Sequence, residues 1–173
     1  MHSYGGLVGS EATLEQFSWE KRKAAGLAGG VIHLFFFAAF ILAEGQSVLG
    51  ALGESPGNDI RPGGRFRILD PANTLYNDLP PDEAEYWASR IIDQSYAVQT
   101  TQLTRAAYRY IPSTYVVCEN DHGPPPQWQE LCGKNAGSTV LKIDSGHSPM
   151  LSKPDELANM IHAAAQKAMN YVL

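Results

Sequence analysis

The sequence predicts an α/β protein built on a mostly parallel sheet flanked by helices. Short apolar runs alternate along the chain with segments of helical spacing, an order typical of a parallel sheet with crossover helices. At 173 residues the chain is long enough to bury a substantial core. Polar residues that can carry chemistry follow the predicted strands directly, which is where active residues gather in such sheets.

The first part of the chain is expected to form a helix, a buried strand and a long irregular segment. Apolar spacing predicts a helix over residues 7–17. The most apolar stretch, residues 31–43, has 13 residues, whereas a membrane span needs about 20. Its residues 31–40 therefore predict a buried strand. Glycines and prolines recur from Glu44 to about Asn73 and predict a loop-like segment.

Two helices and two strands are expected next. A helix begins near Pro80-Pro81, and a second is predicted over Thr100–Tyr110. Strands are predicted over Thr114–Cys118 and Thr139–Ile143, because both segments are short, β-branched and followed by polar residues. The apolar face of the first helix is formed by Ala84, Trp87, Ala88 and Ile91.

The last element is predicted to be a helix that follows Ser152. Ser152 and Asp155 have the Ser-x-x-Asp spacing of a capping box, and Pro154 suits a first helical turn. The predicted buried face of this helix runs to the end of the chain and contains Leu157, Ile161, Ala164, Ala165, Ala168 and Val172.

Charge and cysteine content exclude several classes of partner. The net charge is −5 and no run of Lys or Arg stands out, so neither nucleic acid nor an anionic membrane is expected as a partner. Cys118 and Cys132 match no zinc or redox spacing, and no metal or other cofactor is predicted. Free thiols are the default expectation, with a single disulfide left open. No signal peptide is visible, and a cytoplasmic location is expected.

The first five residues after Met1 raise the question of a catalytic serine. His2-Ser3-Tyr4-Gly5-Gly6 fits the right-hand part of the nucleophile-elbow pattern G-x-S-x-G. Gly5 meets the demand for a small residue two positions after the serine, whereas Met1 stands where the first glycine is expected. Taken alone, the segment is also explained as a flexible glycine-rich start with an incidental serine.

An acid and a base follow the two later strands. Asp121 comes after the strand at 114–118, and His147 comes after the strand at 139–143. The chain order Ser3, Asp121, His147 is therefore the Ser…Asp/Glu…His order of one class of serine hydrolases. A serine hydroxyl becomes a nucleophile when an imidazole takes its proton, and a carboxylate holds that imidazole in the required tautomer.

Each of these residues has alternatives. Asp121 is also explained as a turn aspartate before a proline-rich loop, and His147 as a solvated loop histidine. Glu119 is the first rival for the acid, and Glu44, which follows the strand at 31–40, is the second.

Four stretches of the chain carry a resemblance to a known superfamily. HSYGGLVGSEA, VIHLFFFAAFILAEGQS, STYVVCENDHGPPPQWQ and SGHSPMLSKPDELA resemble the α/β-hydrolases, most closely the group of plant methylesterases and hydroxynitrile lyases and their fungal relatives. The resemblance implies residues 1–45 as hydrolase core, 46–98 as a cap insertion and 99–173 as core. The chain would then hold the C-terminal part of the hydrolase sheet.

The resemblance also implies roles for individual residues. Ser3 resembles the nucleophile, Asp121 the acid, His147 the base, and the backbone N–H of Tyr4 a donor of the oxyanion hole. Three aromatic residues of the cap are candidates to line the substrate pocket: Tyr76, Tyr86 and Trp87. For Trp87, a place in the core of the cap is the favoured alternative.

The activity implied by the resemblance is hydrolysis of a small apolar ester through an acyl-enzyme. In the superfamily several strands precede the elbow, so this chain is expected to lack one oxyanion donor, a loss that typically costs about 10²–10³ in kcat. The bare edge of the strand at 31–40 further predicts self-association. The alternatives are an inactive remnant that binds an apolar ligand or a partner, and a hydroxynitrile lyase. Ser148 disfavours the latter, because those enzymes carry a lysine directly after the base histidine.

Overall fold

The computed structural model describes residues 1–171 and confirms the α/β class. Its main sheet has three parallel strands in the order β1-β5-β6. Their bounds are Leu34–Phe37 for β1, Ser113–Cys118 for β5 and Thr139–Ile143 for β6. The two later strands lie where the sequence predicts them. The first is shorter than the predicted 31–40, because the chain leaves the sheet after Phe37.

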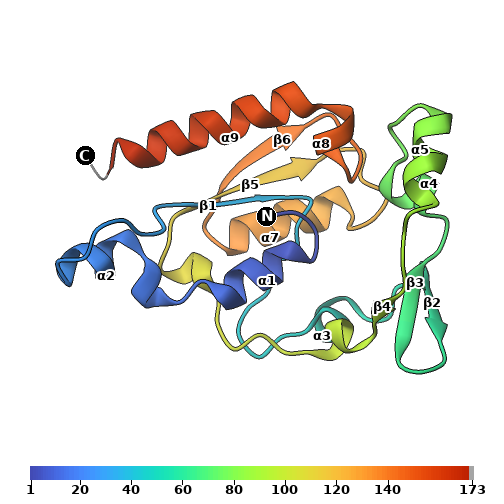
Figure 1. The fold of residues 1–173 in the computed structure, drawn as a ribbon, viewed down its shortest axis with the longest axis horizontal. Helices are drawn as coiled ribbons and strands as arrows, with labels where there is room; N and C mark the ends of the chain where they lie inside the picture. Colours follow the sequence, from blue (N-terminus) through green and yellow to red (C-terminus); the bar gives the residue numbers. More distant parts are fainter. Residues whose placement is uncertain (172–173) are drawn as a thin grey trace.

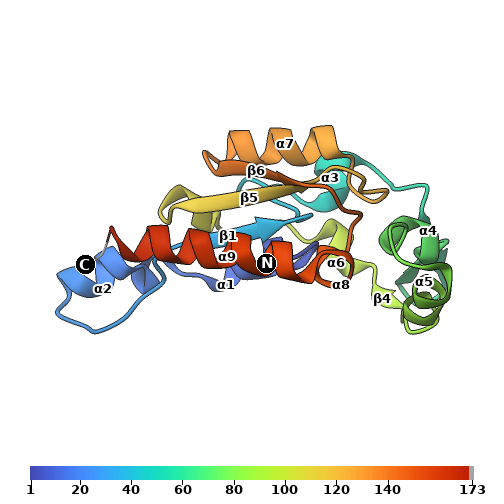
Figure 2. The same cartoon turned by 90° about the horizontal axis from the view of Figure 1, so that it is seen from above.

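The sheet is covered on both faces, as Figures 1 and 2 show. Helix α7 (Pro126–Asn135) lies on one face and the long helix α9 (Pro154–Met169) on the other. Alternate residues of β5 follow this division. Tyr115 packs with the cluster that includes Cys132 of α7, whereas Val116 packs with Leu157 of α9. All six residues of β5 are buried, which is expected of a central strand covered on both faces.

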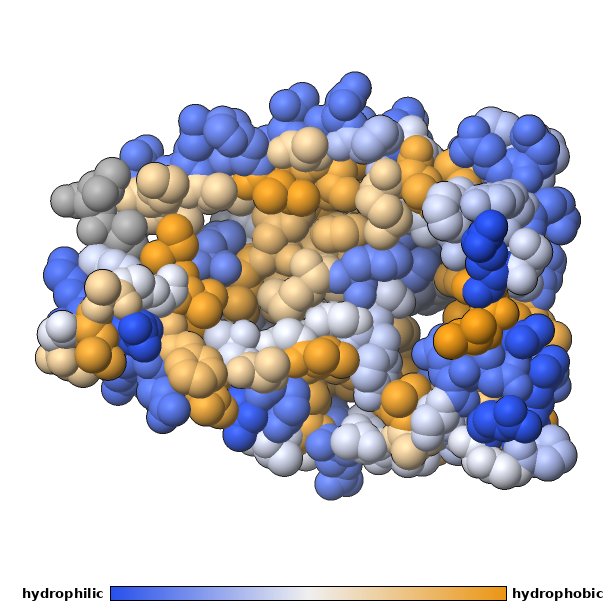
Figure 3. All heavy atoms as spheres, in the orientation of Figure 1, coloured by the Kyte–Doolittle hydropathy of each residue, from blue (hydrophilic) through white to orange (hydrophobic). Residues whose placement is uncertain are grey.

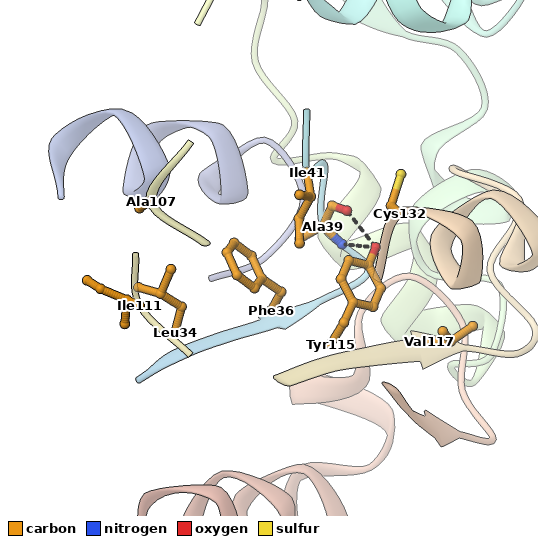
Figure 4. Close-up of a cluster of buried hydrophobic side chains, with 9 residues drawn as sticks. All are labelled: Leu34, Phe36, Ala39, Ile41, Ala107, Ile111, Tyr115, Val117 and Cys132. Carbon is orange, nitrogen blue, oxygen red and sulfur yellow. Dashed lines mark hydrogen bonds between the residues drawn. The ribbon is translucent and has the colours of Figure 1, made fainter. Parts of the chain in front are cut away.

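A buried tyrosine fixes the segment that leaves β1 (Figure 4). The Tyr115 hydroxyl accepts a hydrogen bond from the Ala39 N–H at 3.0 Å and donates one to the Ala39 carbonyl at 2.5 Å. The preceding residue, Ala38, has a φ of 44°, a left-handed conformation that side chains other than glycine rarely adopt. Tyr115 therefore holds a strained turn directly after β1.

The N-terminal helix is divided where the sequence predicts one continuous helix over 7–17. Helix α1 covers Gly5–Ala12, a 3₁₀ turn covers Glu15–Phe17, and α2 covers Trp19–Ala24. Thr13 ends α1 with an extended ψ of 94°, and its hydroxyl donates to the Gly9 carbonyl at 2.7 Å. This local bond gives the backbone an alternative to continuing the helix.

The segment for which the resemblance implies a cap, residues 46–98, is more regular than the sequence predicts. The expectation of a loop from Glu44 to Asn73 is wrong, because this segment holds a helix and a β-hairpin. The turn glycines of the hairpin, Gly63 and Gly64, have φ values of 81° and 68°, so they reverse the chain between two strands. The elements are α3 (Val48–Leu52), β2 (Asn58–Arg61), β3 (Arg65–Ile68), α4 (Pro71–Leu75), α5 (Pro81–Ala88), β4 (Gln94–Ser95) and α6 (Ala97–Thr100).

The arginines of the hairpin are paired, which explains how such charged strands form. Arg61 and Arg67 contact Asp93 at 3.2 and 2.7 Å, and Arg65 approaches it at 3.7 Å. The small antiparallel sheet β2-β3-β4 thus brings three like charges around one carboxylate.

The predicted helix over Thr100–Tyr110 is wrong. Helix α6 ends at Thr100, and only a 3₁₀ turn, Ala107–Arg109, follows before β5. The intervening backbone is held by distant partners instead. Leu103 bonds to residues 45 and 46 through its carbonyl and its N–H, and the Thr104 N–H donates to Glu11 at 2.9 Å. Tertiary hydrogen bonds therefore replace helical ones.

Two details of the C-terminal half also differ from expectation. Helix α7 was not predicted, because three consecutive prolines suggest a loop; the third of them, Pro126, is the first helical residue, a position that tolerates proline. The predicted capping box is wrong as well. Ser152 ends α8 (Pro149–Ser152), its hydroxyl is buried without a partner within residues 1–171, and Lys153 precedes α9 without a side-chain cap.

The expected buried face of α9 is only partly covered. Leu157 and Ala168 are buried, but Ile161 is 42% exposed and Ala165 is also exposed. Ala164 lines a groove of about 920 Å³ between α9 and the sheet, with Val31, Leu141 and Met160 among its other residues. Figure 3 shows apolar side chains gathered in this region. Val172 lies outside the described residues.

The outer edge of β1 is short and partly occupied, so the expectation of a long bare edge is wrong. The Met1 amino group donates to the Phe35 carbonyl at 2.6 Å, and the Phe37 N–H donates to the Met1 carbonyl at 3.1 Å. His2 forms a parallel bridge with Phe37. The first residues thus take the place of the next strand beside β1.

Neither cysteine forms a disulfide. Cys118 and Cys132 are buried free thiols, and burial raises the pKa of each to about 12, so neither is reactive at neutral pH. Within residues 1–171, no helix is long and apolar enough to cross a membrane.

Candidate active site

The loops after β5 and β6 bring a buried acid and base together. The His147 Nδ1–H donates to Asp121 Oδ2 at 2.9 Å, and the two residues are 3% and 5% exposed. Because Nδ1 faces the carboxylate, Nε2 is left available for proton transfer. Of the residues considered from the sequence, the structure brings this acid and this base into contact.

A glutamine that no sequence motif marks completes the surroundings of Asp121. The side chain of Gln129, on α7, donates to Asp121 Oδ2 and to the Pro124 carbonyl, both at 2.8 Å. Its Oε1 accepts from the Cys118 N–H at 3.1 Å, and it is 0% exposed. The Gly123 N–H donates to the other carboxylate oxygen at 2.7 Å. Asp121 therefore accepts three hydrogen bonds and is fixed in orientation.

Ser3 has the backbone geometry that a nucleophile elbow requires. Its φ of 51° is left-handed, a strained conformation for a serine, and α1 begins two residues later. The Ser3 carbonyl accepts bonds from the N–H groups of Gly6 and Phe40 at 3.0 and 3.1 Å. The turn at Ser3 is thereby tied to the segment that Tyr115 holds after β1.

The glycine that allows this close approach is Gly6, whereas the elbow pattern predicts that role for Gly5. A Cβ atom added at Gly6 would lie well under 3.0 Å from the Phe40 carbonyl oxygen. A Cβ atom added at Gly5 would meet nothing within 4 Å in the described structure. The helix and the segment after β1 therefore touch at position 6.

His2 links the start of the chain to the base. Its Nε2–H donates to the His147 carbonyl at 2.8 Å, and the two ring centroids lie 4.7 Å apart. On its other side the His2 ring stacks on Phe37 at 5.2 Å. His2, the residue before Ser3, therefore binds the loop that carries His147.

Two features of the elbow bear on its chemistry. Within residues 1–171 no hydrogen bond joins the Ser3 hydroxyl to His147, and such catalytic contacts often tighten only with substrate bound. The Tyr4 N–H donates no backbone hydrogen bond in the same part of the chain, so it is available to an oxyanion. The Tyr4 side chain is held separately, because its hydroxyl donates to the Val98 carbonyl at 2.8 Å.

The other candidates from the sequence lie elsewhere. Glu119 is 3.6 Å from Lys142 and 46% exposed in its side chain, and Glu44 is exposed. Tyr86 packs edge-on against Trp87 at 5.1 Å and beneath Arg90 at 4.4 Å. A pocket role for Tyr76, Tyr86 and Trp87 stays a prediction.

The environment of His2 predicts a pH-dependent stability. Burial, with a smaller effect from the charge of His147, lowers the pKa of His2 to about 4 from 6.5. Since the folded pKa lies below the unfolded one, the stabilisation is complete above pH 6.5 and is lost as the pH falls towards 4. The difference corresponds to about 3 kcal/mol. We expect urea unfolding of His2→Phe to lack this part of the pH dependence.

The control for this experiment is His162→Gln, because His162 is an exposed histidine on α9. Its unfolding free energy is expected to follow that of the unmodified chain from pH 7 to pH 4. Parallel pH profiles for His2→Phe and the unmodified chain would contradict the assignment.

Comparison with known proteins decides the family. The model of the "Alpha/beta hydrolase family" matches residues 1–160 of the chain. The chain belongs to the alpha/beta hydrolase family. This hydrolase chain is 31% identical, over an alignment of 176 positions, to "Alpha/beta hydrolase nvfD" of Aspergillus novofumigatus, and the alignment covers 97% of the chain and 69% of that protein. The expected superfamily membership is thereby confirmed.

Solved structures agree on the fold of this hydrolase chain. Polyneuridine aldehyde esterase superposes with a TM-score of 0.69 at 18% identity, over 95% of the chain and 69% of that structure. A methylesterase from Arabidopsis superposes with a TM-score of 0.64 at 17% identity, over 95% and 67%. The chain spans about two thirds of the length of these structures, so it has the fold in partial form.

Proposed function

We propose that this hydrolase chain is a serine esterase with Ser3 as nucleophile, His147 as base and Asp121 as acid. The observation that carries the proposal is the buried Asp121–His147 hydrogen bond of 2.9 Å. The strained turn at Ser3 supports it, because the preceding residue, His2, binds the His147 carbonyl. An acid, a base and a serine on a strained turn, in this chain order, are the components of acyl transfer.

The steps follow from the orientation of His147. Its Nε2 takes the Ser3 proton while Oγ attacks the ester carbonyl, and the Tyr4 N–H donates to the oxyanion that forms. Collapse expels the alcohol, which receives the proton from His147, and leaves Ser3 acylated. Water then attacks the acyl group with His147 again as base, releasing the acid and restoring Ser3. Asp121 stays ionised throughout and stabilises the imidazolium.

The proposed substrate is a small apolar ester. Similar folds include proteins named polyneuridine aldehyde esterase, pyrethroid hydrolase and methylesterase, which favours ester substrates. Ser148, rather than lysine, follows His147, and this residue favours hydrolysis over cyanohydrin cleavage.

The test is labelling of the purified chain with a fluorophosphonate, read by intact mass. We expect one adduct per chain, located on Ser3 by peptide mapping, and no adduct in Ser3→Ala or His147→Ala. Ser10→Ala is the matched control, because Ser10 is a buried serine of the helix that follows Ser3. A folded chain that takes up no label, or labelling that survives in Ser3→Ala, would rule out the proposal.

The apolar groove beneath α9 favours a second candidate function, which is binding without catalysis. Its volume of about 920 Å³ lies in the size range of ligand sites. In this case binding of an apolar dye, or self-association measured by sedimentation, would be unchanged in Ser3→Ala. The substitution Ala164→Asp, in the groove, would reduce the dye binding or the self-association.

A further inference from the structure

The turn between α4 and α5 of the cap reaches both loops that carry the acid–base pair. Figure 1 shows the carboxyl ends of β5 and β6 pointing toward these two helices. The Asn77 side chain donates through Nδ2 to the Asn120 carbonyl at 2.9 Å. Asp78 accepts through Oδ2 from the Gly146 N–H at 2.6 Å. Two adjacent cap residues therefore bind one loop each.

These two contacts fall directly beside the reacting groups. Asn120 immediately precedes Asp121, and Gly146 immediately precedes His147. The bond between the two loops, from the Asn120 N–H to the Ser145 carbonyl at 3.0 Å, adds a link within the core. A shift of either loop would change the distance between the carboxylate and the imidazole.

The absence of a side chain at Gly146 permits this arrangement. A Cβ atom there would lie within 3.0 Å of both Asn77 Oδ1 and Asp78 Oδ1. These two oxygens are themselves buried and have no hydrogen-bond partner within residues 1–171. Burying polar atoms without hydrogen-bond partners costs free energy. The two hydrogen bonds that the same side chains form with the loops offset this cost.

A third contact extends the same surface. The His122 Nδ1–H lies 3.0 Å from the Asn73 carbonyl, at α4. His122 follows Asp121 in the chain, so the acid is flanked on both sides by residues bound to the cap.

We propose that Asn77 and Asp78 are positioning residues that couple the seating of the cap to the alignment of Asp121 with His147. The roles of that acid and base rest on the proposed function. When the cap packs against the core, its contacts hold both loops in place. The hydrogen bond from His147 Nδ1–H to Asp121 Oδ2 is then protected from proton exchange. When the cap moves away from the core, each loop loses the hydrogen bond at the residue that precedes Asp121 or His147.

The experiment compares Asp78→Ala with Asp78→Asn, which keeps an acceptor for the Gly146 N–H. The readouts are the His147 Nδ1–H proton resonance with its exchange rate, and the rate of fluorophosphonate acylation. A misplacement of a catalytic group by about 1 Å can cost about 100-fold in rate. We expect Asp78→Ala to speed exchange and slow acylation by this factor, with probe affinity unchanged, and Asp78→Asn to restore both.

Two further variants keep the test independent of one substitution. Gly146→Ala changes the core instead of the cap. It is expected to speed exchange and slow acylation as Asp78→Ala does, because its Cβ displaces the side chains of Asn77 and Asp78. Glu85→Ala, an exposed cap residue on α5, is expected to change nothing. Circular dichroism tests whether each variant is folded.

The outcomes separate this inference from the esterase proposal. A resonance that responds to Asp78, in a chain that takes up no label, supports the coupling and rejects the esterase. An unmodified chain without the resonance, an Asp78→Ala variant equal to the unmodified chain, or an Asp78→Asn variant as impaired as Asp78→Ala would overturn the coupling.

Discussion

Asp121→Asn is expected to slow acylation of Ser3 by roughly 10⁴-fold, the usual cost of replacing the acid of such a triad. The reason lies in the three donors that surround the carboxylate, from Gly123, Gln129 and His147. An amide offers one oxygen and one NH₂ group, so at least one donor must face another donor. His147 can avoid a donor facing a donor by carrying its proton on Nε2. In that tautomer Nε2 cannot accept the Ser3 proton.

The measurement is the rate of fluorophosphonate adduct formation, followed by intact mass. Asp144→Asn is the matched control, since Asp144 is an exposed carboxylate that accepts from Asn120 in the neighbouring loop at 2.6 Å. Its rate is expected to stay within a few-fold of the unmodified chain. If Asp121→Asn labels as fast as Asp144→Asn, Asp121 is not the acid.

Gly6→Ala and Gly5→Ala are expected to change stability in opposite directions, although they lie side by side in α1. The Cβ atom at position 6 would strike the Phe40 carbonyl, and such overpacking typically costs about 1–3 kcal/mol. For a domain of this size, that loss lowers Tm by roughly 2–12 °C. The Cβ atom at position 5 meets open space, and a helical Gly→Ala change gains up to about 0.5–1 kcal/mol.

Thermal unfolding by differential scanning calorimetry measures both changes. Each variant serves as the control for the other, because helix propensity alone would raise Tm in both. A rise in Gly6→Ala would show that α1 does not touch the segment after β1 as described.

The sequence was most informative where a pattern is local. The strands at β5 and β6 follow from β-branched runs, and Asp121 and His147 follow from their places just after those strands. The hairpin β2-β3 was missed because its turn glycines look like loop markers. Its arginines look solvated until Asp93, which lies 26 residues beyond Arg67, is known to pair with them.

Residues that act through distant partners could not be predicted in this way. Gln129 reaches Asp121 only because α7 forms after three prolines, and nothing in its immediate sequence marks it. Asn77 and Asp78 resemble ordinary turn residues until their contacts with residues 120 and 146 are seen. Gly6 differs from Gly5 only through the position of the Phe40 carbonyl. In each case the information lies in tertiary geometry.

The site is assembled from remote parts of the chain, and this arrangement bears on how the protein folds. The bond from His2 to His147 spans 145 residues, that from Asp78 to Gly146 spans 68, and that from His147 to Asp121 spans 26. Contacts of such separation close large loops, whose entropic cost must be met before they stabilise the fold. Helices α7 and α9 can form early from local contacts, whereas the elbow, acid and base meet late. During refolding, reactivity at Ser3 should therefore recover after helical circular dichroism.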